Sequence, residues 1–215
     1  MDEEVRHPFF ARLYIWMSKG RDPEEKYRRR LLAGAQGRVI EVGAGNGLNF
    51  AHYPPEVTEV VAIEPEPRLR EEAIKAARNA SVAIEVKDGV AGTLPAEDGS
   101  FDTAVASLVL CSVPDQVKAL AEISRVIKPD GNLHFYEHVI AREAGPVRFM
   151  RFADATFWPH LAGGCHMSRD TTSAIEAAGF EIDEIDRFPF SPARFVPSLP
   201  HVLGRASRPR QTWEA

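Results

Sequence analysis

A stretch of three glycines directly after an apolar run constrains this chain more than any other feature. It lies in VIEVGAGNGLNF, residues 39 to 50, and contains Gly43, Gly45 and Gly47. Glycine permits positive φ angles and lets the backbone approach a ligand closely. A dinucleotide-binding loop needs a further glycine where this chain has Leu48, which counts against an NAD-dependent oxidoreductase. The stretch therefore predicts a strand followed by a site for a smaller ligand.

Length, charge and cysteine content bound the size and setting of the protein. With 215 residues, 44% of them hydrophobic, the chain can bury one substantial core, so we expect a single domain over 1–215. The net charge of -5 argues against nucleic-acid binding, and we interpret the basic clusters at 28–30 and 205–210 as solvated faces. Two cysteines cannot form a disulfide framework, and residues 2–4 are acidic where a signal peptide is basic, so we expect a cytoplasmic protein.

Short apolar runs alternate with helical patterns, which is typical of an α/β sheet built from crossover units. Strands are predicted at 38–42, 59–64, 82–86, 102–107, 131–139, 180–188 and 201–207. Helices are predicted at 67–79, 115–128 and 170–178, and an aromatic-rich helix follows residue 145. The helix at 115–128 is expected to bury Val117, Leu120, Ile123 and Ile127. In such a doubly wound sheet the ligand lies at the carboxyl ends of the strands.

Polar residues stand at each of these strand ends. Glu41 precedes the glycines, and Glu64 ends the second strand, where an acid can accept both hydroxyls of a ribose. The later strand ends carry Asp88 to Ala91, Ser107 to Cys111, and Glu137 with His138. Each has a structural alternative: the glycines can serve a tight turn, and Glu64 can cap the following helix. Their convergence on one edge favours a ligand site.

Longer segments follow one another in a recognisable order: VIEVGAGNGLNF, VVAIEPEP, VAGTLPAEDGSFDTAVASLVLCSVPD and ALAEISRVIKPDGNLHFYEHV. They resemble the motifs of class I S-adenosylmethionine-dependent methyltransferases with a type 11 domain, over about residues 25 to 140. SLVLCSV, YEHV, GGCHMSRDT, AGF and VPSLPHVLGRA are similar to the methyltransferase-like group that contains the thiol S-methyltransferases. The resemblance implies a Rossmann-like sheet of seven strands, the last antiparallel, with helices on both faces.

The same resemblance divides the chain and assigns its donor site. It implies N-terminal helices or a lid at 1–34, a donor-binding core at 35–140, and acceptor-side helices with C-terminal strands at 141–215. S-adenosylmethionine would be the cofactor and S-adenosylhomocysteine the product. Glu41 would compensate the donor's ammonium, Glu64 would hold its ribose, and backbone groups near Val90 would read its adenine. The expected donor-site residues are Glu41, Gly43, Ala44, Gly45, Gly47, Asn49, Glu64, Pro65, Asp88, Gly89, Val90, Ala91, Ser107 and Leu108.

On the acceptor side, His138 is the best-placed candidate catalytic residue, with hydrogen-bonded packing as its alternative role. The expected acceptor-binding residues are Tyr14, Cys111, His138, Trp158 and His166. We interpret Cys111 and Cys165 as small buried residues rather than nucleophiles. A metal site of Cys165 with His160 and His166 is disfavoured because these ligands are bunched within seven residues, so no metal is expected.

The segment HPFFARLYIWM predicts an N-terminal helix with Phe9, Leu13, Trp16 and Met17 along one face. We expect this face to pack as core and the helix to close over the donor, in preference to contact with a membrane surface. The chain is therefore expected to methylate a small, lipophilic acceptor, with a thiol first. A quinone-precursor carbon, a phospholipid amine and an arsenical are the alternatives, and a non-catalytic donor-binding protein is the hypothesis from another class. We expect a monomer or homodimer.

Overall fold

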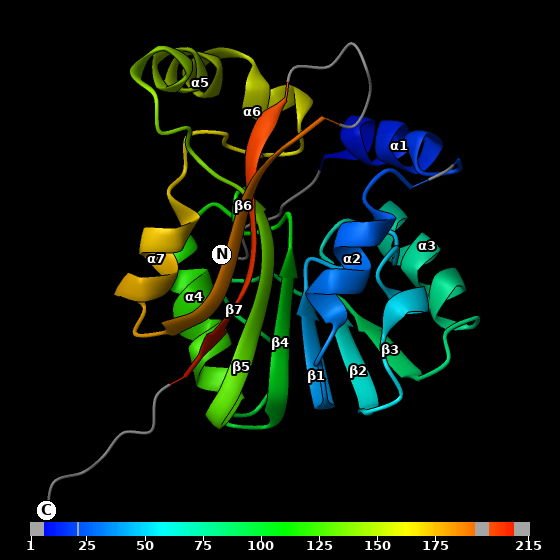
Figure 1. The fold of residues 1–215 in the computed structure, drawn as a ribbon. Coiled ribbons are helices and arrows are strands. Elements are labelled where there is room, and N and C mark those ends of the chain that lie inside the picture. Colours follow the sequence, from blue (N-terminus) through cyan, green and yellow to red (C-terminus); the bar gives the residue numbers. More distant parts are fainter. Residues whose placement is uncertain (1–6, 21, 192–197, 209–215) are drawn as a thin grey trace, which may run out of the picture.

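The computed structural model describes residues 7–20, 22–191 and 198–208, arranged around one seven-stranded sheet (Figure 1). Residues 2–4, on which the signal-peptide argument depends, and Arg210, the last residue of the basic cluster at 205–210, lie outside these ranges. The strand order is β3-β2-β1-β4-β5-β7-β6. The strands from β3 to β5 in this order pair in parallel, and β7 is antiparallel to both of its neighbours. The predicted Rossmann-like, doubly wound sheet with an antiparallel last strand is confirmed.

The elements follow the predicted alternation of strands and helices. The strands are β1 Gly37–Val42, β2 Val57–Ile63, β3 Ala83–Lys87, β4 Phe101–Ser107, β5 Ile127–His138, β6 Glu181–Phe190 and β7 Leu199–Ser207. The helices are α1 Pro8–Met17, α2 Glu25–Leu32, α3 Pro67–Ala77, α4 Gln116–Val126, α5 Ala144–Thr156, α6 Trp158–Leu161 and α7 Thr171–Ala177, with a 3₁₀ turn η1 at Phe50–His52. The carboxyl ends of the parallel strands thus meet at one edge, beneath α1 and α6 (Figure 1).

Helices cover both faces of the sheet, because successive residues of a strand point to opposite sides. In β1, Ile40 joins the core beneath α4 and α7, whereas its neighbour Val39 joins the core beneath α2 and α3. Ala104 and Val105 of β4 divide in the same way. Since both faces are buried, the central strands are mostly apolar, and most of their polar side chains stand near their ends.

Helix α4 differs from the predicted helix at 115–128. It ends at Val126, and Ile127 is already extended, with φ -82° and ψ 147°. Lys128 precedes Pro129, and a proline disfavours helical geometry at the residue before it. The chain therefore passes directly into β5. The predicted apolar face is also wrong at Val117, whose side chain is 75% exposed. The buried residues of the helix are Ala119, Leu120, Ile123 and Val126.

The predicted core packing of the α1 face is wrong. Phe9 and Trp16 are 72% and 71% exposed, and Leu13 and Met17 are exposed as well. Helix α1 crosses the edge of the sheet instead of lying on a face (Figure 1), so only its inner side meets protein, with Ala11 buried.

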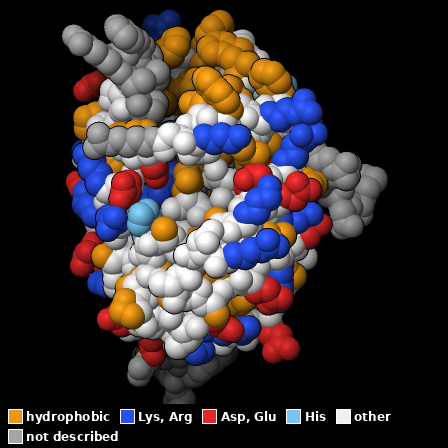
Figure 2. All heavy atoms as spheres, turned by 90° about the vertical axis from the view of Figure 1, so that its right-hand side faces the viewer, with side chains coloured by type: hydrophobic (Ala, Val, Ile, Leu, Met, Phe, Trp, Pro, Cys, Tyr) orange, Lys and Arg blue, Asp and Glu red, His pale blue; other side chains and the backbone are white. Residues whose placement is uncertain are grey.

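Hydrophobic side chains gather at this end of the molecule (Figure 2). Exposed members from the acceptor-side helices are Phe149, Phe152, Phe157 and Leu161. No helix in the described ranges has the length and hydropathy needed to span a membrane.

Candidate active site

The glycine loop after β1 adopts a backbone that only glycine accepts without strain. Gly43, Gly45 and Gly47 have φ angles of 70°, 58° and 82°. A Cβ at Gly43 would lie 2.3 Å from Cγ2 of Val109, and one at Gly47 would lie 2.8 Å from the ring of Phe50. The backbone N–H groups of Gly43 and Ala44 both donate to the carbonyl of Ile63. The glycines therefore allow both the turn and the close approach of the β4 loop.

Replacing Gly43 by alanine is expected to lower the free energy of unfolding by about 2–4 kcal/mol, from left-handed strain and from the clash with Val109. Gly99→Ala is the matched control, because Gly99 has φ 58° and nothing lies within 4 Å of a Cβ there. That variant is expected to lose only about 1–2 kcal/mol. Urea denaturation of both variants measures the difference, and equal losses would contradict a packing role for Gly43.

Glu64 follows β2 and holds the glycine loop through its carboxylate. One oxygen accepts the N–H of Gly45 at 2.7 Å, and the other accepts the N–H of Glu66 at 2.9 Å. The side chain is 5% exposed, and burial raises its pKa although both hydrogen bonds oppose the shift. Glu66 in turn accepts the backbone N–H of His7, just before α1. The acid thus links the glycine loop, the start of α3 and the N-terminal helix.

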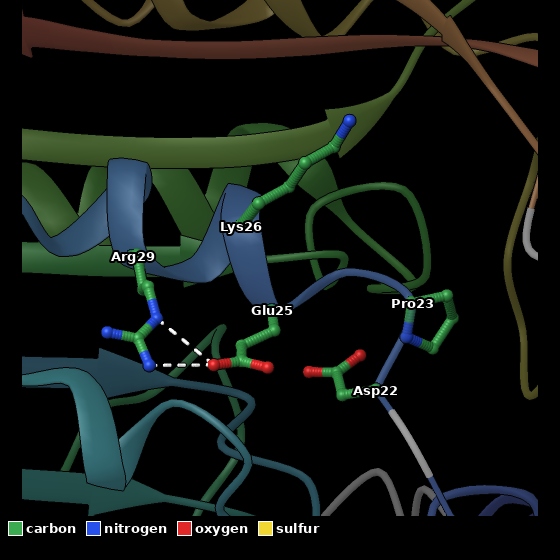
Figure 3. A pocket seen from close by; sticks show the side chains of 5 residues that line it. All are labelled: Asp22, Pro23, Glu25, Lys26 and Arg29. Carbon is green, nitrogen blue, oxygen red and sulfur yellow. Dashed lines mark hydrogen bonds and ion pairs between the residues drawn. The ribbon is translucent and has the colours of Figure 1, made fainter.

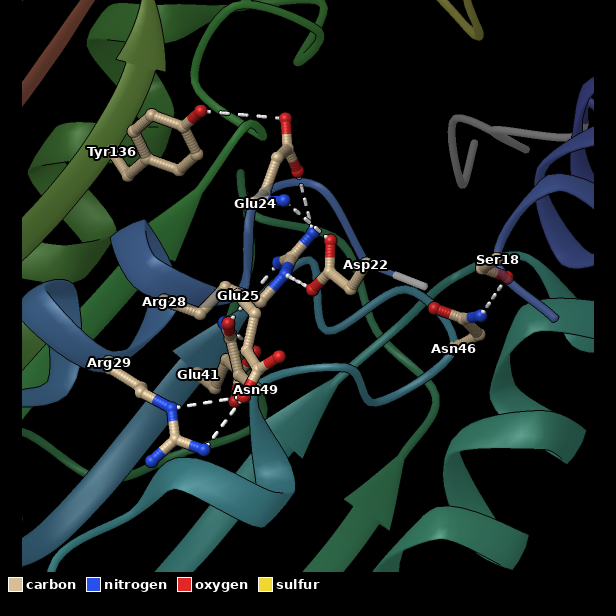
Figure 4. A network of polar contacts seen from close by, with 10 residues as sticks. All are labelled: Ser18, Asp22, Glu24, Glu25, Arg28, Arg29, Glu41, Asn46, Asn49 and Tyr136. Atoms are coloured by element: carbon tan, nitrogen blue, oxygen red, sulfur yellow. Dashed lines mark hydrogen bonds and ion pairs between the residues drawn. The ribbon is translucent and has the colours of Figure 1, made fainter. Parts of the chain in front are cut away.

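Glu41, in β1, heads a buried polar network (Figure 4). Its oxygens accept hydrogen bonds from the amide of Asn49 at 2.8 Å and the hydroxyl of Tyr53 at 2.6 Å. Burial raises the pKa of Glu41 to about 7, although both hydrogen bonds oppose the shift. Asn49 accepts from Arg28 at 3.2 Å, so the amide is fixed from both sides.

Arg28 is not part of a solvated face, contrary to expectation. It is 4% exposed, and its guanidinium bonds Asp22 at 2.8 Å and Glu24 at 2.7 Å, as well as Asn49 (Figure 4). Because a buried charge needs partners, these acids explain how it is tolerated. Glu24, the N-cap of α2, lies four residues before Arg28, and this spacing was the sequence signal for the pairing. Arg28 orients the Asn49 amide toward Glu41.

The loop after β3 presents backbone more than side chains. Asp88 accepts from Arg70 at 2.8 Å, but its side chain is 73% exposed. Arg70 also donates to the carbonyls of Glu64 and Pro65, which ties this loop to the end of β2. Val90 and Ala91 are half-buried beside Gly89, and Val90 forms an isolated bridge with Thr93.

The end of β4 carries an unusual backbone and an unpaired polar atom. Leu108 has φ 55°, a conformation that is costly for a branched residue and that clusters at functional sites. Within the described part of the chain, the buried hydroxyl of Ser107 has no hydrogen-bond partner. The same holds for Oδ1 of Asn46 in the glycine loop. Buried polar atoms are normally paired, so both are suited to contact a ligand.

Glu137, near the end of β5, fixes the loop that follows Leu108. Its fully buried carboxylate accepts the backbone N–H groups of Val109, Leu110 and Cys111 at 2.9–3.0 Å. Burial raises its pKa to about 7 against these three hydrogen bonds. Sequence reasoning placed Glu137 at a strand end but assigned it no function. It therefore fixes the position of the loop that follows β4.

His138, Cys165 and Cys111 form a compact cluster, which we call the Cys–His cluster. Nδ1 of His138 lies 3.2 Å from Sγ of Cys165, which lies 3.5 Å from Sγ of Cys111. The hydrogen bond between Cys165 and Cys111, followed by the interactions with His138, lowers the pKa of Cys165. Burial lowers the pKa of His138, but its interactions with Cys165 outweigh that effect and raise it. The cluster therefore lowers the pKa of the Cys165 thiol and raises that of the His138 imidazole beside it.

Of the other expected acceptor residues, Trp158 and His166 lie beside this cluster, whereas Tyr14 lies over the glycine loop. Trp158 begins α6, and its buried indole N–H is among the groups that lower the pKa of Cys165. The backbone N–H of His166 donates to the carbonyl of Cys111 at 2.8 Å. Tyr14 of α1 lies over the glycine loop, where its ring carbon Cε1 would be 3.9 Å from a Cβ on Gly45. Ser18, also at the end of α1, accepts from Asn46 at 2.7 Å.

A cavity of about 470 Å³ opens at the start of α2 (Figure 3). Its lining residues are Asp22, Pro23, Glu25, Lys26 and Arg29. Arg29 is paired with Glu25 at 2.7 Å, and none of the five is an expected donor ligand. The cavity adjoins the polar network through Asp22, which holds Arg28, and does not coincide with the strand ends.

Comparison with known proteins gives a consistent assignment. A family model described as a methyltransferase domain matches residues 40–135. Thiol S-methyltransferase TMT1B of Homo sapiens is 37% identical over 182 residues, covering 81% of this chain and 73% of that protein. Thiol S-methyltransferase TMT1A of Homo sapiens is 35% identical over 179 residues, with 81% and 72% covered.

Solved structures share the fold. The YcgJ protein of Bacillus subtilis superposes with a TM-score of 0.67 at 17% identity, covering 94% of this chain and 99% of that one. Geranyl diphosphate methyltransferase in complex with S-adenosylmethionine gives a TM-score of 0.68 at 15% identity, with 93% and 90% covered.

Proposed function

Since the chain belongs to the methyltransferase family of TMT1B and TMT1A and uses S-adenosylmethionine, we propose that it methylates the sulfur of a small, lipophilic thiol. The observation that carries this proposal is the Cys–His cluster at the carboxyl ends of β4 and β5, next to the glycine loop. A sulfur nucleophile has to be ionised and aligned with the donor's methyl group, and the donor itself supplies the leaving group.

We assign the donor to the edge formed by β1, β2 and the β3 loop. Glu64 would accept the ribose hydroxyls, since each carboxylate oxygen retains a lone pair after bonding one backbone N–H. The backbone of the glycine loop would receive the donor's carboxylate, and Glu41 with Asn49 would compensate its ammonium. Ser107 and Leu108 would face the donor from β4. Backbone groups of Val90 and Ala91 would meet the adenine, because Asp88 is held outward by Arg70.

The affinity for S-adenosylhomocysteine is expected to rise about tenfold between about pH 6 and pH 8, because binding a ligand ammonium favours ionised Glu41. The pKa of Glu41 is raised to about 7, so a growing fraction of the protein carries the charge across this interval. Calorimetric titration at several pH values measures the trend. Glu41→Gln is the control and should remove it; an equal pH dependence in that variant would exclude Glu41 as the cause.

Helix α1 is proposed to close the donor side. It meets the site through the hydrogen bonds of His7 with Glu66 and of Ser18 with Asn46, while Tyr14 lies over the glycine loop and Phe10 packs on Gly163. The exposed hydrophobic residues of α1, α5 and α6 gather at the same end of the molecule (Figure 2). An apolar acceptor would bury part of its own surface against these side chains on its way to the cluster, which supports a lipophilic substrate.

A panel of thiol, amine, phenol and quinone acceptors with labelled S-adenosylmethionine tests the proposed acceptor. We expect label to appear in thioethers of small aliphatic and aromatic thiols, with kcat/KM rising with the apolar area of the thiol. Preferential methylation of an amine or a quinone precursor would overturn the thiol assignment. Donor binding without turnover of any acceptor would indicate a regulator or scaffold instead.

A further inference from the structure

We propose that the Cys–His cluster is a zinc site that binds the sulfur of the acceptor; the acceptor half of this inference rests on the proposed function. The ligand atoms of Cys111, His138 and Cys165 all lie within 4.8 Å of one another. Two thiolates and an imidazole are a ligand set that Zn²⁺ prefers, and three protein ligands leave a fourth position open. Within the described residues, this group contains neither His160 nor His166.

Two of the three distances are close to those of tetrahedral coordination, and the third, between Cys111 and His138, is within 4.8 Å. Zn–S bonds of about 2.3 Å and Zn–N bonds of about 2.0 Å place two sulfurs about 3.8 Å apart and a sulfur and a nitrogen about 3.6 Å apart. The observed separations are 3.5 Å between the two sulfurs and 3.2 Å between Cys165 and His138. Small side-chain shifts would therefore admit the ion. Two thiolates also neutralise its charge, as a buried site requires, and Cys111 and Cys165 are 1% and 5% exposed.

The three ligands come from separate segments that other contacts hold together. Cys111 follows β4, and its backbone N–H is fixed by Glu137, the neighbour of His138 in β5. The segment of Cys165 is joined to it by the bond from the His166 N–H to the Cys111 carbonyl. Arg169 then donates to the carbonyls of Leu110 and Val113, at 2.8 and 2.6 Å. These bonds position the ligands before any ion binds, which is what a catalytic metal site needs.

The open position would serve the acceptor thiol. On binding the ion, the thiol would release its proton to solvent and remain a sulfur nucleophile at neutral pH. One of its electron pairs would form the new carbon–sulfur bond to the donor's methyl group. The bond from that methyl group to the sulfonium would break, and its electrons would remain on the sulfur of S-adenosylhomocysteine. The thioether product has no thiolate charge and would leave the ion.

Metal titration of the full chain tests the site without any methyl transfer. Protein stripped of metal under a phosphine reductant is titrated with Zn²⁺ against a chromophoric chelator, and with Co²⁺ by absorption. We expect one ion per chain and a thiolate-to-cobalt band. Cys165→Ser and Cys111→Ser should each lose at least about tenfold in affinity. The control His160→Ala changes an exposed histidine of the same region and should match the parent.

Binding that survives both cysteine substitutions, or no binding by the folded parent, would overturn the zinc site; thermal unfolding verifies that each variant is folded. Addition of a small aliphatic thiol should shift the cobalt band, and an unchanged spectrum would overturn the acceptor role. Thiol methylation by metal-free protein would overturn the acceptor role of the ion but leave the proposed function standing. Zinc binding without methylation of any thiol would leave the zinc site standing and overturn the proposed function.

Discussion

Glu64→Gln is expected to weaken binding of S-adenosylhomocysteine by about 10- to 150-fold, or about 1.5–3 kcal/mol. The substitution removes the negative charge and replaces one acceptor oxygen by an NH₂ group. The two oxygens of Glu64 accept the backbone N–H groups of Gly45 and Glu66. The new NH₂ group would therefore face an N–H group and could not accept a hydrogen bond from it. The ribose would therefore lose a bond and the glycine loop would lose its support. Titration calorimetry measures the affinity.

The control for this variant is Glu97→Gln, which neutralises an exposed acid outside the site. It should bind S-adenosylhomocysteine like the parent. Thermal unfolding of Glu64→Gln separates a loss of fold from a loss of contact. A folded Glu64→Gln variant with unchanged affinity would remove Glu64 from the donor site, and with it most of the proposed ribose contacts.

His138→Ala is expected to lower kcat/KM for a weakly acidic thiol by about 10²-fold or more and to leave donor affinity nearly unchanged. The imidazole lies 3.2 Å from Cys165, whereas Glu41 and Glu64, the proposed donor ligands, lie in β1 and directly after β2. If His138 favours the thiolate form of the acceptor, the loss should shrink as the pKa of the thiol falls. A thiol that is already ionised needs no such help.

A series of thiols of graded acidity, at fixed pH and saturating donor, gives the ratio of parent to variant kcat/KM. His160→Ala is the control and should give a ratio near one throughout. A ratio that is large but constant across the series would mean that His138 only packs or orients. The T-shaped contact of its ring with that of His201, at 4.4 Å, is the structural basis for that alternative.

The donor half of the fold was predictable because its signals are local. Apolar runs of the right length gave β1 to β4 within about two residues, and the three glycines located the turn that their positive φ angles now explain. Glu41 and Glu64 were named as candidate site residues because they are acids at the ends of apolar strands. Parallel strands bring such ends to one edge, so position along the chain was enough.

The missed features depend on contacts between distant segments. Cys111 and Cys165 are separated by 54 residues, and only the path of the chain through α5 and α6 brings the sulfurs together. Arg28 reads as surface because its neighbours are arginines, although α2 buries it against Asn49. The orientation of α1 could also not be predicted from its own sequence, because large apolar residues lie on several sides of the helix. The segments that pack against α1 decide which side is covered.

The carboxylate of Glu137 also has a consequence for motion. A connecting loop normally opens to solvent at little cost, because few buried groups hold it. Here the loop of Val109, Leu110 and Cys111 can open only if the three hydrogen bonds from its N–H groups to Glu137 break and the buried carboxylate becomes exposed to solvent. We infer that these amides exchange with solvent as slowly as those of the sheet interior. The segment that separates donor from acceptor would then belong to the most rigid part of the chain, and turnover would involve movement of the helices above it.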